Sequence, residues 1–113
     1  MAKVIITKEL EEAINKKFKK ESIEIFELMN SLKENPKKGK ALGNIGAIVI
    51  KELRYKSFRF YFITDGFKLK MLSSNMLTDL LIKFIRMSDK KDQQKTIDEI
   101  KKVLRNLGEE GFQ

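Results

Sequence analysis

Cysteine and histidine are both absent from this chain of 113 residues. The absence of cysteine excludes disulfide scaffolds, thiolate zinc sites and cysteine nucleophiles. The absence of histidine removes the commonest general base and the commonest metal ligand. Catalysis would therefore have to use Lys, Arg, Tyr, Ser, Thr, Asp or Glu. The carboxylates form no cluster typical of a divalent metal site, so we expect neither a metal nor a cofactor.

Long apolar runs are also missing. The longest mixed stretch, Met76–Ile85, is interrupted by Asp79 and Lys83, and it falls short of the roughly 20 apolar residues that a membrane helix needs. The first residues reach charged side chains after a few apolar positions, which is not typical of a signal peptide. We expect one domain over residues 1–113, a cytoplasmic location and no membrane partner.

Positive charge is concentrated in the middle of the chain. Residues 35–91 hold 13 basic and 4 acidic side chains, a net charge of +9. Residues 1–34 are neutral overall, and residues 92–113 have a net charge of −1. Lysines that only kept the protein soluble would be spread more evenly, so this distribution favours a polyanionic partner such as nucleic acid or an acidic protein surface.

The apolar patterns predict an α+β domain in which an N-terminal helical hairpin packs on a small antiparallel sheet, followed by a C-terminal helix. A short opening strand at Lys3–Ile6 precedes the helices, and Thr7 is the expected cap of the first of them. We expect the helices to cover one face of the sheet. The further elements are a helix at Glu21–Lys33, a loop at residues 36–46, strands at Ala47–Arg54, Phe58–Thr64 and Phe67–Ser73, an extended segment at Met76–Met87, and a helix ending at Leu107 before Gly108. Asp65 and Gly66 form the expected turn between the second and third of these strands.

The strand around residues 58–63 carries the most functional information. Alternate side chains of a strand share a face, so Phe58, Phe60 and Phe62 should point into the core. The opposite face then presents Arg59 beside Tyr61. A solvated sheet face is one interpretation of this pair, and a preorganised phosphate-binding surface is the other.

The order of these motifs resembles the RelE/ParE toxin superfamily. The resemblance extends over Glu21–Leu107. Its positions are Leu32, Asn35, Pro36 and Gly39, followed by Leu53, Arg54, Phe58 and Arg59. The later segment Phe84–Ile100 resembles the Gp49-like and HigB-like branch.

The resemblance implies a site for RNA cleavage by the 2′-hydroxyl, which needs a base, cations and an acid but no metal. It implies that Arg59 holds the scissile phosphate, with Lys51, Arg86 and Tyr61 as further catalytic candidates. The nucleic-acid-binding candidates are Arg54, Lys56, Lys83, Lys90 and Lys91.

The resemblance also implies a function: the toxin of a type II toxin–antitoxin pair, acting as a ribosome-dependent mRNA endoribonuclease that inhibits translation. Its partners would be mRNA, the ribosome and an antitoxin with an acidic or amphipathic segment. Two alternatives stay open. One is a non-catalytic module of the same fold, such as a gyrase inhibitor, which the absence of any tyrosine after Tyr61 favours. The other is an unrelated basic domain that binds RNA or DNA.

Overall fold

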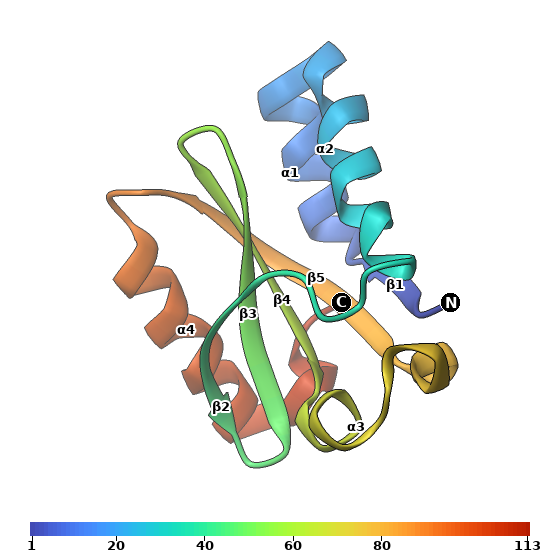
Figure 1. Cartoon of the computed structure of the whole chain (residues 1–113). Helices are drawn as coiled ribbons and strands as arrows, with labels where there is room; N and C mark the ends of the chain where they lie inside the picture. The colour runs from blue at the N-terminus through green and yellow to red at the C-terminus, as the bar shows by residue number, and fades with distance from the viewer.

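The computed structural model describes the backbone of residues 1–113 and every side chain except those of residues 74, 75 and 78. The chain begins with strand β1 (Lys3–Ile6), which confirms the predicted opening strand. The helical hairpin follows this strand, so its predicted position at the N-terminus is wrong. Two helices follow, α1 (Lys8–Phe18) and α2 (Ser22–Asn30), and they lie side by side in Figure 1. The predicted cap is confirmed, because the hydroxyl of Thr7 accepts a hydrogen bond from the backbone N–H of Leu10.

The sheet has five strands in the order β1-β5-β4-β3-β2. Its other members are β2 (Lys40–Ile45), β3 (Ile48–Tyr55), β4 (Phe58–Asp65) and β5 (Leu81–Asp89). β1 pairs with β5 in parallel, whereas the remaining pairs are antiparallel. The α+β class is therefore confirmed, but the sheet is mixed and not antiparallel throughout. The long stretch of chain between β1 and β5 gives the room that a parallel pair requires.

Helices cover both faces of this sheet, which corrects the prediction of a single covered face. The helices α1 and α2 pack on one face, against Phe60 and Phe62 among others. Helix α4 (Gln93–Leu107) packs on the other face, against Ile50, Tyr61 and Ile63. In Figure 1, α4 (orange to red) and the α1–α2 pair (blue) stand on opposite sides of the strands. Two covered faces follow from the central strands, which carry apolar side chains on both sides.

Residues 66–71 form a short helix, α3, where the sequence predicted a hairpin turn and a third strand. Asp65 is the last residue of β4. Its carboxylate accepts hydrogen bonds from the backbone N–H groups of Phe67 and Lys68. It therefore acts as a helix cap instead of a turn residue. The alternating sequence after it belongs to a helix whose Leu69 packs on the core while Phe67 and Met71 face solvent.

Two smaller differences concern the remaining connections. The predicted loop over residues 36–46 contains β2, which pairs with β3 and has an irregular register between Ala41 and Gly43. The predicted extended segment over residues 76–87 begins as a 3-10 turn and becomes β5 only at Leu81. Short 3-10 turns lie at Lys19–Glu21, Ser31–Lys33, Ser74–Asp79 and Gly108–Gly111. No helix in the described part of the chain is long and apolar enough to cross a membrane.

Candidate nucleic-acid interface

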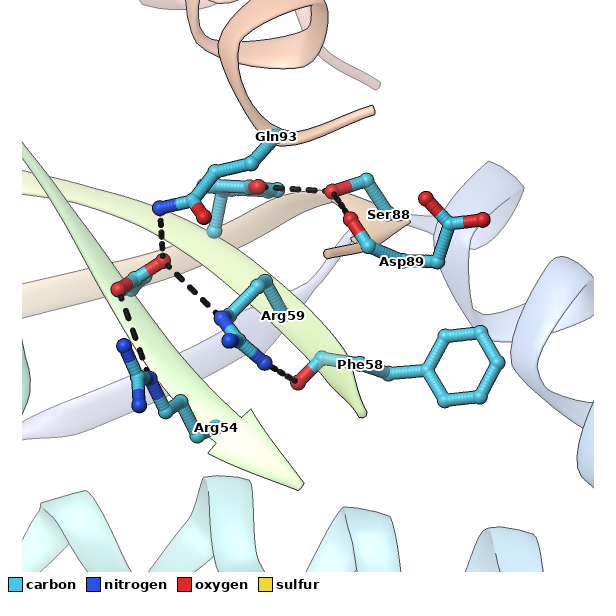
Figure 2. A network of polar contacts seen from close by, with 8 residues as sticks. Arg54, Phe58, Arg59, Ser88, Asp89 and Gln93 are labelled. Carbon is cyan, nitrogen blue, oxygen red and sulfur yellow. Dashed lines mark hydrogen bonds and ion pairs between the residues drawn. The ribbon is translucent and has the colours of Figure 1, made fainter. Parts of the chain in front are cut away.

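Two arginines face each other across the hairpin of β3 and β4. Arg54 pairs with Arg59 in the antiparallel register. Glu52 lies on the same face of β3 as Arg54, because the two are two positions apart in a strand. The carboxylate of Glu52 lies between them, with Oε1 3.9 Å from Nε of Arg54 and Oε2 3.8 Å from Nε of Arg59 (Figure 2). Like charges directly opposite each other repel. The carboxylate therefore allows the two arginines to occupy paired positions.

The three side chains differ strongly in exposure. The side chain of Arg54 is 62% exposed, whereas those of Arg59 and Glu52 are 5% and 1% exposed. Arg59 donates a hydrogen bond from Nη1 to the carbonyl oxygen of Phe58, at 3.3 Å. Within the described part of the chain, Nε of Arg59 and Oε1 of Glu52 are buried without a hydrogen-bond partner. Arg54 is thus the accessible cation, and the buried ion pair behind it keeps unused hydrogen-bonding capacity.

The start of α4 covers the buried ion pair of Arg59 and Glu52. Gln93, the first residue of α4, donates a hydrogen bond from Nε2 to Oε2 of Glu52, at 3.2 Å (Figure 2). Beside it, the hydroxyl of Tyr61 lies 2.7 Å from Oγ of Ser88, which donates to the carbonyl oxygen of Asp89 at 2.9 Å. Burial raises the pKa of the Tyr61 hydroxyl, so Tyr61 stays protonated at neutral pH.

Lys51 lies on the opposite face of the sheet from Arg59. Its side chain is buried, and Nζ donates a hydrogen bond to the carbonyl oxygen of Lys37 at 2.9 Å. The same amine lies 5.8 Å from the centre of the Phe62 ring. Burial lowers the pKa of Lys51. The loop that contains Lys37 and Gly39 packs closely on Phe62. A Cβ at Gly39, whose φ is +106°, would lie 2.8 Å from Cζ of Phe62. Two predicted catalytic residues, Lys51 and Arg59, therefore lie on opposite faces of the sheet.

Arg86 stands on the α4 side, paired with Tyr61 in the register of β4 and β5. Its Nε lies 3.1 Å from a carboxylate oxygen of Glu99 in α4, and its guanidinium lies 4.9 Å from the centre of the Phe112 ring. The remaining predicted cations are dispersed: Lys56 pairs with Glu21, Lys83 donates to the carbonyl oxygen of Glu109, and Lys90 and Lys91 are exposed before α4. The structure thus brings together Arg54, Arg59, Tyr61 and Arg86 on one face of the sheet.

Three residues of this cluster were not predicted to belong to it. These residues are Glu52, Ser88 and Gln93. The period of two along β3 could have placed Glu52 on the face of Arg54, because the two are separated by two positions. Ser88 and Gln93 join the cluster through the pairing of β5 and the docking of α4, and no local motif indicates either contact.

No three carboxylates among the described side chains converge closely enough to hold a metal ion. Comparisons with models of protein families, with curated protein sequences and with solved structures found no match. The resemblance to the RelE/ParE toxins therefore stays a prediction, and a function has to be argued from the residues themselves.

Proposed function

We propose that this chain is the toxin of a type II toxin–antitoxin pair and inhibits translation by cutting mRNA on the ribosome without a metal ion. The observation that supports this best is the pair Arg54 and Arg59, held around Glu52 and beside Tyr61 on one face of the sheet. Guanidinium groups suit the planar, bidentate recognition of phosphate. The net charge of +9 over residues 35–91 favours approach of a polyanion such as RNA.

Glu52, the arginines and Tyr61 match the needs of cleavage by the neighbouring 2′-hydroxyl. In that reaction the 2′ oxygen attacks phosphorus, the bond from phosphorus to the 5′ oxygen breaks, and a 2′,3′-cyclic phosphate remains. Glu52 would take the proton of the 2′-hydroxyl once Gln93 and the start of α4 had moved off its carboxylate. The arginines would stabilise the charge on the phosphate. Tyr61 would return a proton to the 5′ oxygen, because a phenol carries its proton at neutral pH.

A second candidate is a non-catalytic module that binds nucleic acid or a protein such as gyrase. It is favoured by the burial of Arg59 and Tyr61 under the start of α4. In this arrangement Arg54 is the accessible cation, and it could bind a polyanion without any reaction. The position of Lys51 on the opposite face also favours this candidate.

Induced expression in a tightly controlled host, with growth curves and primer extension on abundant mRNAs, tests both candidates. The variant Arg54→Ala removes an exposed side chain, so it should fold as the wild type does. Arg105→Ala removes an exposed arginine from the last turn of α4 and serves as the matched control. We expect wild type and control to arrest growth and to cut mRNA in frame. Arg54→Ala should cut about 10- to 100-fold less.

The outcomes separate the two candidates. Soluble wild-type protein that neither arrests growth nor cuts mRNA would contradict the toxin proposal in that host. Growth arrest with altered DNA supercoiling and uncut mRNA would instead support the non-catalytic module. Equal cutting by wild type and Arg54→Ala would show that the arginine pair is not the phosphate site.

A further inference from the structure

A groove of about 370 Å³ opens between the hairpin of β2 and β3 and helix α3. Its floor consists of small residues, among them Ala41, Ala47 and Val49, and its wall carries Phe67 and Lys70. Val49 precedes Ile50, which packs under α4, so the floor belongs to the opposite face of the sheet from Arg54 and Arg59. Figure 1 shows α3 beside the turn between β2 and β3, at the end of the sheet away from α1 and α2.

The apolar part of the wall, Phe67, is exposed and firmly positioned. Phe67 is 68% exposed and Met71 is 65% exposed, and their spacing of four residues places them on one face of α3. The cap at Asp65 fixes the start of this helix. Gly66 lets it approach the strand, because a Cβ there would overlap Cγ2 of Val49. Large apolar side chains held beside a groove are typical of an interaction site.

The charge around the groove is positive. Lys70 lines it. Two further cations lie on the other face of the same edge strand: Lys40, which pairs with Glu52, and Lys101 of α4, whose amine would lie 3.4 Å from a Cβ at Gly43. None of the described residues that line the groove is acidic. Residues 36–50 and 66–78 together contain five lysines and no aspartate or glutamate. The occupant that this charge fits is therefore an anion.

The backbone beside the groove favours a peptide. In the described sheet, β2 is an edge strand with β3 as its single neighbour. The outer N–H and C=O groups of an edge strand can pair with an added extended segment. The apolar floor and wall suit alternate side chains of such a segment better than they suit a chain of phosphates, because Lys70 is the one cation that lines the groove itself.

We propose that this groove binds an extended acidic peptide of a partner protein. Alternate apolar side chains of the peptide pack on Val49 and Phe67, and its carboxylates, which alternation places on the other face of the sheet, lie near Lys40 and Lys101. Because the groove lies on the opposite face from Arg54, a partner bound here leaves the candidate RNA site uncovered. Assigning the peptide to an antitoxin rests on the proposed function, whereas the binding itself does not.

Fluorescence polarisation with a labelled heptapeptide, EVELEVE, tests the proposal on the purified chain. The peptide ESESESE has the same charge without apolar side chains, and it should bind at least about tenfold more weakly. We expect Phe67→Ala and Lys40→Glu each to weaken binding of EVELEVE about tenfold. Ile23→Ala on α2 and Lys102→Glu on α4 change exposed residues outside the groove and should leave binding within about twofold.

Three results would overturn the proposal. They are no binding of EVELEVE up to about 1 mM, equal binding of both peptides, and binding that Phe67→Ala and Lys40→Glu leave unchanged. A labelled oligouridylate that binds where EVELEVE does not, and that loses affinity in the same variants, would reassign the groove to nucleic acid. The measurement uses purified protein and a peptide, so it succeeds or fails independently of growth arrest and mRNA cutting.

Discussion

Lys51 is a buried cation whose contacts do not compensate its burial. Its side chain is 4% exposed, and its contacts are the carbonyl oxygen of Lys37 and the ring of Phe62. No carboxylate forms an ion pair with it among the described side chains. Burial lowers the pKa of Lys51, which means that the folded protein disfavours the charged amine despite both contacts. Replacing the amine by an apolar group of similar length should therefore stabilise the protein.

The expected gain for Lys51→Met is about 1 kcal/mol at pH 7. The variant loses a hydrogen bond from a charged donor, worth about 1.5–3 kcal/mol, and a cation–π contact of about 0.5–1 kcal/mol. It removes a desolvation penalty of several kcal/mol for the buried ion, whereas apolar burial changes little because the methylene stem of Lys51 is already buried. For a chain of this length, a gain of 1 kcal/mol raises the Tm by about 4 °C.

Thermal and urea unfolding, followed by circular dichroism between pH 7 and pH 10, measures this effect. The pKa of Lys51 is lower in the folded chain than in the unfolded chain, so the unfolded chain binds more protons between the two pKa values. The stability of the wild type should therefore rise with pH in that window. Lys51→Met lacks this contribution, so its advantage should shrink as the pH rises. A variant that is less stable at pH 7, with an unchanged pH slope, would refute the reasoning.

Other substitutions test the packing around the two faces. Arg59→Ala should cost about 3–5 kcal/mol in urea unfolding, because it leaves the carboxylate of Glu52 buried without its cation; adding Glu52→Gln should recover part of the loss. Gly66→Ala should lower the free energy of unfolding by about 1–3 kcal/mol, because the added methyl group overlaps Val49. Phe112→Ala should cost about 3–5 kcal/mol, since this ring is buried against α4 near the C-terminus. Costs below about 0.5 kcal/mol would contradict these assignments.

Local periodicity predicted the central strand correctly. Phe60 and Phe62 lie in the core under α1 and α2, and Tyr61 lies on the opposite face, as alternation requires. The bounds of β1 and the end of α4 at Leu107 before Gly108 are also confirmed. These features depend on neighbours in the sequence, where a period of two or a cap residue carries the information.

Local periodicity gave the wrong prediction for residues 67–73, because a short helix and a half-buried strand can show the same alternation of apolar and charged residues. Phe67, Leu69 and Met71 alternate with lysines, which is typical of a half-buried strand. The structure forms a helix there, with Leu69 facing the core and the other two facing solvent. The cap formed by Asp65 and the close approach at Gly66 decide the outcome, and the approach depends on Val49, which is distant in the sequence.

The candidate site shows the same limit at the level of tertiary structure. Alternation placed Arg59 and Tyr61 on one face, and both interpretations of that face, a solvated surface or a phosphate-binding surface, required it to be exposed. The face is instead covered by α4, whose first residue donates a hydrogen bond to Glu52. Whether a strand face is open or covered depends on where a helix about 30 residues further along docks. The apolar side chains that contact this helix include Ile50 and Ile63, which share the face of Arg59 with Tyr61 between Ile63 and the arginine. Helix α4 packs on the apolar half of the face, and its first residue also covers Glu52 in the polar half. Arg54 lies near the end of β3 and remains the exposed member of the arginine pair.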